Sequence, residues 1–177
     1  RGLFNLGGAR GTAPARRNSN LIAGTNPCGE IMLRDQQFCN LSEVVVKDYD
    51  NLDRLLDKVE TATWIGVIQS TFTEFPYLRE RWTRNCQIER LLGVSLTGMG
   101  DNLQLMSSDA LSALKMRALR ISRKAADTLG TQQPKAVTCV KPSGTVSQLV
   151  NSSSGMHPRY SKYYLRRYRI SATDPLY

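Results

Sequence analysis

Three side chains of different chemistry alternate along one short stretch: the amide of Asn26, the thiol of Cys28 and the carboxylate of Glu30. If this stretch is extended or is a tight loop tip, alternate side chains point the same way. A carboxylate can take a hydroxyl proton, an amide can hold a second hydroxyl, and a sulfur can react as thiolate or as thiyl radical. The pattern therefore favours one site that acts on a hydroxylated substrate.

The two residues between them permit an ordinary interpretation as well. Pro27 fixes one φ angle, and Gly29 lets a substrate approach the backbone closely. However, Asn-Pro and Cys-Gly are also common turn dipeptides, and a free cysteine is most often a small buried hydrophobic residue. Taken alone, these five residues favour a plain turn, and the motifs downstream reverse that preference.

Two more segments carry groups that could bind or react. Cys39 lies eleven residues after Cys28, in FCNLSEVV at 38–45. The loop KPSGTVS at 141–147 follows a β-branched run and offers hydroxyls and backbone N–H groups, which can bind phosphate oxygens. It is not a Walker loop, because the order GxxxxGK[ST] is absent. The expected phosphate-binding residues are Pro142, Ser143, Gly144, Thr145, Val146 and Ser147.

Five motifs together resemble the ribonucleotide reductases, and within them the adenosylcobalamin-dependent, class II type that reduces ribonucleoside triphosphates. They are NPCGEI at 26–31, FCNLSEVV at 38–45, LLGVSLTG at 91–98, VKPSGTVSQL at 140–149 and SSGMHPRYS at 153–161. Their order and spacing along most of the chain carry the resemblance. It implies an oxidoreductase that uses adenosylcobalamin and supplies deoxyribonucleotides for DNA synthesis.

The resemblance also implies a role for each reactive residue. Cys28 matches the family's thiyl radical, which abstracts the 3′-hydrogen of the ribose. Glu30 would deprotonate the 3′-hydroxyl, and Asn26 would hydrogen-bond the sugar. Cys39 matches a reducing thiol, which forms a disulfide with a cysteine from an earlier part of the longer chain. Thioredoxin or a similar dithiol reductant would reopen that disulfide.

The remaining cysteines and the single histidine stay outside the catalytic set. Cys139 is interpreted as a structural residue within a strand, and Cys86, near a turn, could be exposed. One histidine, His157, argues against His-based metal catalysis, and a structural imidazole is favoured there. The four cysteines show neither metal-ligand spacing nor the density of a secreted disulfide scaffold, so no metal site is expected.

Hydrophobic periodicity predicts an α/β arrangement. In chain order the sequence predicts a loop at 7–24, short buried strands at 31–33 and 44–46, an amphipathic helix at 52–71, a strand at 91–98, a helix at 109–129 and a strand at 136–140. Strand, helix and strand in succession indicate parallel strands joined by a crossover. The resemblance further implies a ten-stranded α/β barrel, with Cys28 on a central finger loop at about 24–34.

Length and composition suit one globular unit of 177 residues with 41% hydrophobic content. We expect residues 1–177 to be a fragment of the C-terminal part of the reductase's catalytic barrel, inactive in isolation. No stretch is long and apolar enough to cross a bilayer and no secretion leader is visible, so a cytoplasmic protein without a membrane partner is expected.

Two other functions are weighed against this one. A class II reductase acting on diphosphates has the same motifs, and the gap between the cysteines does not separate the two substrates. A basic nucleic-acid-binding module would use the net charge of +9 and the Arg- and Tyr-rich stretch at 159–169. That module would bind in a salt-sensitive way even without Cys28. It leaves the Asn-Cys-Glu set unexplained, so direct nucleic-acid binding is not expected.

Overall fold

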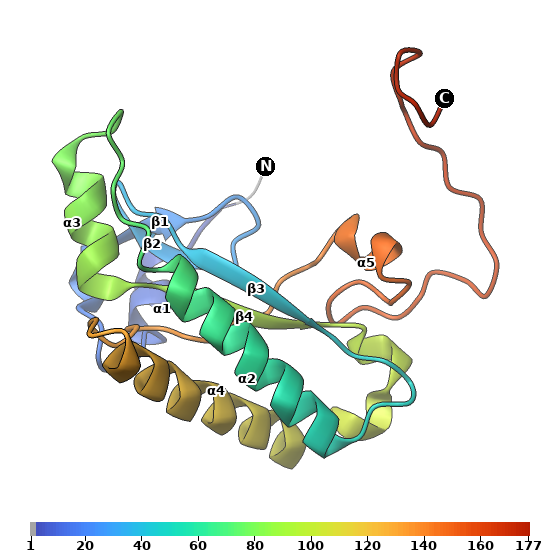
Figure 1. Ribbon diagram of the computed structural model, residues 1–177, viewed down its shortest axis with the longest axis horizontal. Coiled ribbons are helices and arrows are strands. Elements are labelled where there is room, and N and C mark those ends of the chain that lie inside the picture. The colour runs from blue at the N-terminus through green and yellow to red at the C-terminus, as the bar shows by residue number, and fades with distance from the viewer. Residues whose placement is uncertain (1–2) are drawn as a thin grey trace.

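The protein is described by a computed structural model over residues 3–177 (Figure 1). In chain order its elements are α1 (Leu6–Gly11), a 3₁₀ turn (Ser19–Leu21), β1 (Ile22–Thr25), β2 (Met32–Arg34), β3 (Asn40–Val45), α2 (Leu52–Gln69), α3 (Glu80–Glu89), β4 (Leu92–Thr97), two further 3₁₀ turns (Met99–Asp101 and Leu103–Leu105), α4 (Ser108–Thr128) and α5 (Val146–Leu149).

The centre of the fold is the unit β3–α2–β4. β3 and β4 pair in parallel, in a register that places Asn40 opposite Leu92 and Val45 opposite Thr97. The crossover predicted from the strand at 91–98 through the helix at 109–129 to the strand at 136–140 is found only in part, because the last segment meets β4 in parallel at a single bridge, Val94 to Thr138. The regular parallel pair joined by a crossover is β3 and β4. The structure is mixed α/β, as the sequence predicted.

Both long helices begin and end close to where the sequence placed them. Asn51 caps α2, because its side chain accepts a hydrogen bond from the N–H of Arg54. Ser107 caps α4 in the same way, accepting from the N–H of Ala110 at 3.2 Å. Gly130, just beyond α4, has a φ of 62°, which glycine adopts without strain.

The hydrophobic core lies between the parallel strands and the two long helices, which run side by side on one face of β3 and β4 (Figure 1). Full burial of an aliphatic side chain contributes about 1.5–3 kcal/mol. The buried core residues are Val44, Val46, Leu55, Val59, Ala62, Val67, Leu92, Val94, Leu114, Ala118, Ala125 and Val137.

The N-terminal part differs from its prediction. The stretch 7–24 is not a continuous loop, since it contains most of α1, a 3₁₀ turn and the start of β1. β1 then pairs antiparallel with β2, and the two strands form a hairpin separate from the β3–β4 sheet. The segment that carries Cys28 is the turn of this hairpin.

Two further predictions need correction. The stretch 136–140 is not a regular strand: it makes one isolated parallel bridge, from Thr138 to Val94 on β4. The sequence also did not predict α3. Arg79, which precedes this helix at the N-cap position, makes no capping hydrogen bond with its side chain, and Arg90, which follows the helix, has a φ of 41°.

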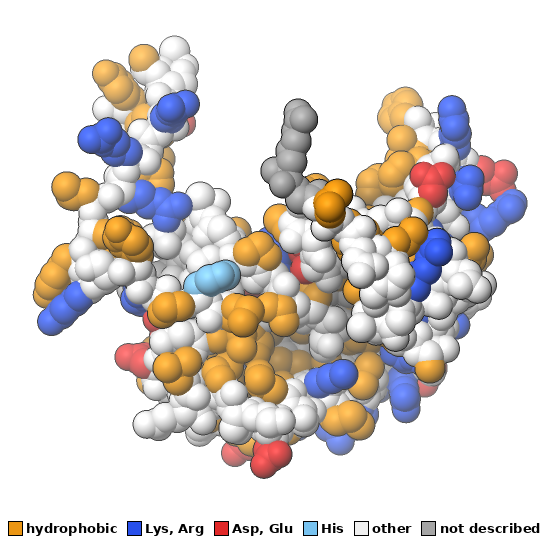
Figure 2. Space-filling model, turned by 180° about the vertical axis from the view of Figure 1, so that it is seen from behind, with side chains coloured by type: hydrophobic (Ala, Val, Ile, Leu, Met, Phe, Trp, Pro, Cys, Tyr) orange, Lys and Arg blue, Asp and Glu red, His pale blue; other side chains and the backbone are white. Residues whose placement is uncertain are grey.

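Arg159 is held on the body by its ion pair with Asp101, and the hydroxyl of Tyr164 donates to Gln148. Beyond these contacts the C-terminal segment runs away from the body as an extended arm (Figure 1). Seen from behind, this arm carries basic and hydrophobic side chains, while further hydrophobic side chains surround a hollow near the middle of the body (Figure 2). Within residues 3–177 no helix has the length and hydrophobicity needed to span a membrane.

Candidate active site

The turn of the β1–β2 hairpin is held by Asn26. Its N–H donates to the carbonyl of Ile31 at 3.1 Å, and its carbonyl accepts from the N–H of Gly29 at 3.0 Å. Its side-chain Oδ1 accepts from the N–H of Ile31 at 3.0 Å. Pro27 and Gly29 occupy the second and fourth positions of this tight turn, as a type I turn favours. Asn26 therefore fixes the loop and uses its amide oxygen to do so.

The thiol of Cys28 lies at the exposed tip of the hairpin, and the cysteine is unpaired. Gly29 beside it has a φ of 82°, and a Cβ built there meets nothing within 4 Å. The segment is a turn rather than an extended strand, so simple alternation does not align residues 26, 28 and 30. What the turn provides is an accessible sulfur beside open space.

Glu30 has the most unusual environment of the three residues. Both of its carboxylate oxygens are buried, and neither has a hydrogen-bond partner within the part of the chain that the structure describes. Buried polar atoms normally have partners, and an unpaired buried carboxylate is costly. Such a group is suited to accept a proton or a hydrogen bond from a bound molecule.

Burial and the charge of the nearby Glu30 carboxylate raise the pKa values of two thiols, Cys39 and Cys139. Burial raises the pKa of Cys39, and the negative charge of Glu30 raises it further. Burial raises the pKa of Cys139 to about 12, with Glu30 and Cys39 as the next contributors. Both groups are therefore protonated thiols near neutral pH.

The sheet explains why these groups meet. Cys139 Sγ lies 3.0 Å from the point where a Cβ on Gly93 would stand, and the side chains of Leu41 and Ile31 approach the same point. Gly93 is in β4, the strand between β3 and the Cys139 segment. Because Gly93 has no side chain, residues from the hairpin, β3 and the Cys139 segment converge over it.

The expected phosphate loop is held on β3 by Glu43, on the strand that follows Cys39. Ser143, which is buried and has a φ of 59°, donates its hydroxyl to Oε1 of Glu43 on β3. Ser147 donates its hydroxyl to the carbonyl of Gly144 at 2.7 Å. Both serine hydroxyls are thus used within the protein, while Pro142, Gly144, Thr145 and Val146 are exposed.

The ends of this loop are fixed on β4. The N–H of Lys141 donates to Ser95 Oγ at 3.0 Å before the loop. After it, Thr97 Oγ1 donates to the carbonyl of Ser153 at 3.1 Å and accepts from the N–H of Gly155 at 3.0 Å. His157 is exposed, and its Nδ1 lies 3.2 Å from the carbonyl of Ser154. The carboxyl end of β4 therefore carries the loop.

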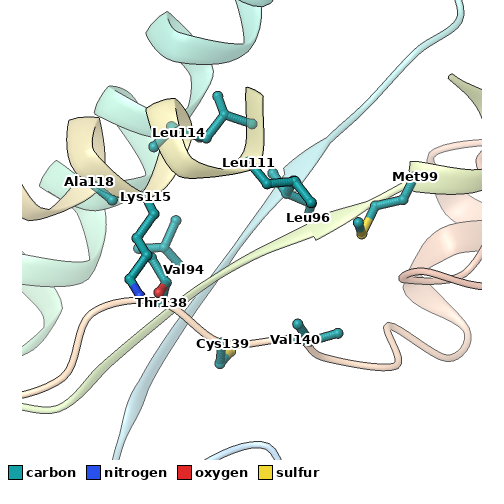
Figure 3. Close-up of a pocket in the computed structure, with 11 residues that line it drawn as sticks. Val94, Leu96, Met99, Leu111, Leu114, Lys115, Ala118, Thr138, Cys139 and Val140 are labelled. Carbon is teal, nitrogen blue, oxygen red and sulfur yellow. The ribbon is translucent and has the colours of Figure 1, made fainter. Parts of the chain in front are cut away.

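A separate pocket of about 310 Å³ lies on the opposite, helix-covered side of β4 (Figure 3). In Figure 3 Cys139 points away from α4, whereas Thr138 points towards it. The lining is hydrophobic apart from Lys115 and Thr138, and it contains neither Cys28 nor Glu30. Cys139 also lines this pocket, but because Cys28, Glu30 and Cys39 do not, it is not the candidate site.

Three residues have surroundings that sequence reasoning did not assign. Cys139, which was expected to be a structural residue within a strand, lies near Glu30 and Cys39, and Glu43 accepts a hydrogen bond from Ser143 of the loop. Cys86 is buried in α3, which corrects the expectation that it could be exposed, and its sulfur accepts the N–H of Phe38. Residues 3–177 hold no cluster of three or more side chains suited to a metal ion.

The raised pKa of Cys139 predicts slow alkylation. With the pKa moved from 9.0 to about 12, the thiolate fraction at pH 8 falls by about 1000-fold. Mass spectrometry of iodoacetamide-treated protein should show Cys139 reacting far more slowly than exposed Cys28, with its rate still rising above pH 9. A plateau near pH 9 would contradict the shift. The folded state gains from this shift below pH 9 and loses that gain as pH rises towards 12.

Comparison with known proteins identifies relatives of the chain. No protein-family model matches it. A Levilactobacillus brevis protein named adenosylcobalamin-dependent ribonucleoside-triphosphate reductase is 30% identical over 210 residues, covering 99% of this chain and 28% of the relative. A Lactobacillus leichmannii protein of the same name is 30% identical over 184 residues, covering 88% of this chain and 25% of the relative. The chain spans about a quarter of the length of these curated relatives.

Two solved structures resemble the fold. A B12-dependent, class II ribonucleotide reductase matches with a TM-score of 0.63 and 26% identity, covering 78% of this chain and 23% of that one. The alpha subunit of a class Id ribonucleotide reductase from Actinobacillus ureae matches with a TM-score of 0.72 over 92% of this chain and 37% of that one. At 23% identity, the second likeness concerns the fold alone.

Proposed function

We propose that this chain, which is homologous over nearly its whole length to the adenosylcobalamin-dependent ribonucleoside-triphosphate reductases, forms the core of the active site of such an enzyme. The observation that carries the proposal is the buried, unpartnered carboxylate of Glu30, adjacent in the chain to an exposed thiol turn and close to two protonated thiols. That combination supplies a base, a radical carrier and a reductant.

The β1–β2 hairpin is proposed to be the finger loop of a ten-stranded α/β barrel, and β3 and β4 to be two of its parallel strands. The hairpin is separate from the β3–β4 sheet, as a loop that enters a barrel must be. Residues 1–177 are then a fragment of the catalytic barrel, with the finger loop at about 24–34 and the phosphate loop at about 141–147.

The reaction begins at Cys28. As a thiyl radical, Cys28 removes the 3′-hydrogen atom of the ribose and becomes a thiol, which leaves the unpaired electron on C3′. The carboxylate of Glu30 accepts the proton of the 3′-hydroxyl, and this favours departure of the 2′-hydroxyl, which leaves as water with a proton from one of the two reducing thiols. Glu30 later returns its proton to the 3′-oxygen. The Asn26 amide nitrogen, which the turn does not use, is free to donate to a sugar hydroxyl. Positioning of this kind can supply about 7–11 kcal/mol of the barrier.

Cys39 is proposed to supply reducing equivalents. Its raised pKa keeps it as a thiol, the form that can give both a proton and an electron. A second thiol, from an earlier part of the whole protein, provides the second proton and the second electron. The two sulfurs then join as a disulfide. Cys28 then returns its hydrogen to C3′. Thioredoxin or a similar dithiol reopens the disulfide in the cytoplasm.

The triphosphate is proposed to bind at the loop 142–147. Gly144, Thr145 and Val146 are exposed there and offer backbone N–H groups and one hydroxyl. Ser143 and Ser147 hold the loop in shape through Glu43 and Gly144. Ser143 thereby links the phosphate end of the substrate to the strand that follows Cys39.

When bound, adenosylcobalamin would supply the radical that accepts the hydrogen atom of the Cys28 thiol and so converts Cys28 to a thiyl radical. The accessible thiol and the open space over Gly29 fit a hydrogen-atom acceptor that approaches from outside the hairpin. The residues that hold the corrin are not assigned within this chain.

The full-length protein provides the test. It should reduce ribonucleoside triphosphates only when adenosylcobalamin and a dithiol are present, with a much lower kcat/KM for diphosphates. Reduction without the cobalt cofactor would remove the class II assignment. Preference for diphosphates would favour the alternative substrate instead.

A further inference from the structure

A buried ion cluster lies at the base of the hairpin, at the opposite end from Cys28. Its centre is Glu89, the last residue of α3, whose side chain is fully buried. Arg17 donates to it through Nε at 2.9 Å to Oε1 and through Nη2 at 2.8 Å to Oε2. Arg34 Nη2 lies 3.1 Å from Oε1, and Gln37 Nε2 donates to Oε2 at 2.8 Å.

These three partners come from both sides of the hairpin. Arg17 precedes the 3₁₀ turn that leads into β1, and Arg34 is the last residue of β2, paired with Ile22 at the start of β1. Gln37 follows β2, and its Oε1 accepts from the N–H of Arg34 at 2.8 Å. One carboxylate therefore holds the chain before the hairpin and the chain after it.

Glu89 is also fixed to the main sheet. Its carbonyl accepts the N–H of Lys135 at 2.8 Å, and β4 begins three residues later, at Leu92. The amide of Asn85, one turn earlier in α3, donates to the carbonyl of Asp35 at 2.8 Å, just after β2. The cluster is thus a rigid connection between the base of the hairpin and the strand that carries the phosphate loop.

The hairpin needs such a connection. Its strands have four and three residues and share no ladder with β3 or β4. An isolated two-stranded hairpin is at best marginally stable in water. Stability alone is a weak reason for two arginines around one buried carboxylate, because well-packed hydrophobic residues often serve as well. Bidentate ion pairs add a fixed geometry that hydrophobic contacts lack.

We propose that Glu89, with Arg17 and Arg34, is a positioning cluster that sets where Cys28 stands relative to the substrate. The cluster does not touch the reacting atoms and acts through the angle of the hairpin. The proposal rests on the proposed function, because it assigns to the hairpin the thiol that begins the reaction.

The test uses the full-length protein with Glu89→Gln, which keeps the shape of the side chain and removes its charge. Hydrogen exchange of the amides in 22–34 should become about tenfold faster or more, while α2 and α4 exchange as in the wild type. Nucleotide reduction should lose about 10- to 100-fold in kcat with little change in KM, since binding of the phosphates is separate from hairpin geometry.

A matched control lies on the same helix. Glu80 pairs with Arg84 at 3.3 Å, with both side chains largely exposed, and Glu80→Gln should change neither readout. If Glu89→Gln does not fold, Arg34→Gln releases β2 alone, and the same two measurements decide.

Unchanged hairpin exchange, or equally faster exchange in α2 and α4, would overturn the proposal. The first result would mean that the hairpin is held by other contacts, and the second that the cluster only stabilises the whole fold. Should the wild-type protein reduce no nucleotide, the proposed function fails, while the exchange data still decide whether the cluster holds the hairpin.

Discussion

Replacing Cys28 by serine is expected to lower nucleotide reduction by the full-length protein by about 10⁴-fold or more. A hydroxyl of nearly the same size stays at the tip of the hairpin, but its O–H bond is too strong to yield the hydrogen atom as a thiol does. Since Cys28 is exposed and forms no disulfide within residues 3–177, folding should be unchanged. Single-turnover assays with bound cofactor measure the loss directly.

Cys86→Ser provides the comparison for that experiment. Cys86 is buried in α3, and a serine oxygen can still accept the N–H of Phe38. This variant removes a thiol elsewhere in the chain and should retain most of the activity. Equal losses in the two variants would mean that Cys28 has no special place in the reaction, and the assignment of the radical thiol would fail.

The long elements of the fold could be predicted because their signals are local. α2 and α4 have helical periodicity over many turns, and Asn51 and Ser107 cap them. α3 gives weaker signals, since it has only 10 residues, few of them apolar, no capping side chain and an arginine in place of the usual glycine at its end. Its position depends on contacts with the hairpin, which no short window of sequence contains.

In the candidate site too, the positions of the residues along the chain could be predicted, whereas their contacts in the fold could not. The motifs locate the reactive residues along the chain. The meeting of Glu30 with Cys39 and Cys139 depends on the pairing of β3 with β4, on the single bridge from β4 to Thr138 and on the missing side chain of Gly93. The Arg17–Glu89 pair joins residues 72 positions apart. Contacts of that range follow from the packing of the whole chain, so reading residue by residue could not find them.

The second large effect is expected for Glu30→Gln. Glutamine keeps the size and polarity of the side chain but cannot accept the 3′-hydroxyl proton, so the rate should fall by about 10²- to 10⁴-fold, the usual contribution of a general base. Substrate binding should change little, because the phosphate loop is untouched. Measuring kcat and KM separately for the full-length variant distinguishes loss of the base from loss of binding.

The same variant carries an internal check on the geometry. Removing the negative charge of Glu30 removes one cause of the raised pKa values of Cys39 and Cys139, so both values should fall and both thiols should alkylate faster at a given pH. This readout needs neither substrate nor cofactor. If activity falls while both alkylation profiles stay as in the wild type, Glu30 acts without lying near the two thiols. If the alkylation profiles shift while activity is retained, Glu30 lies near the two thiols and is not the base.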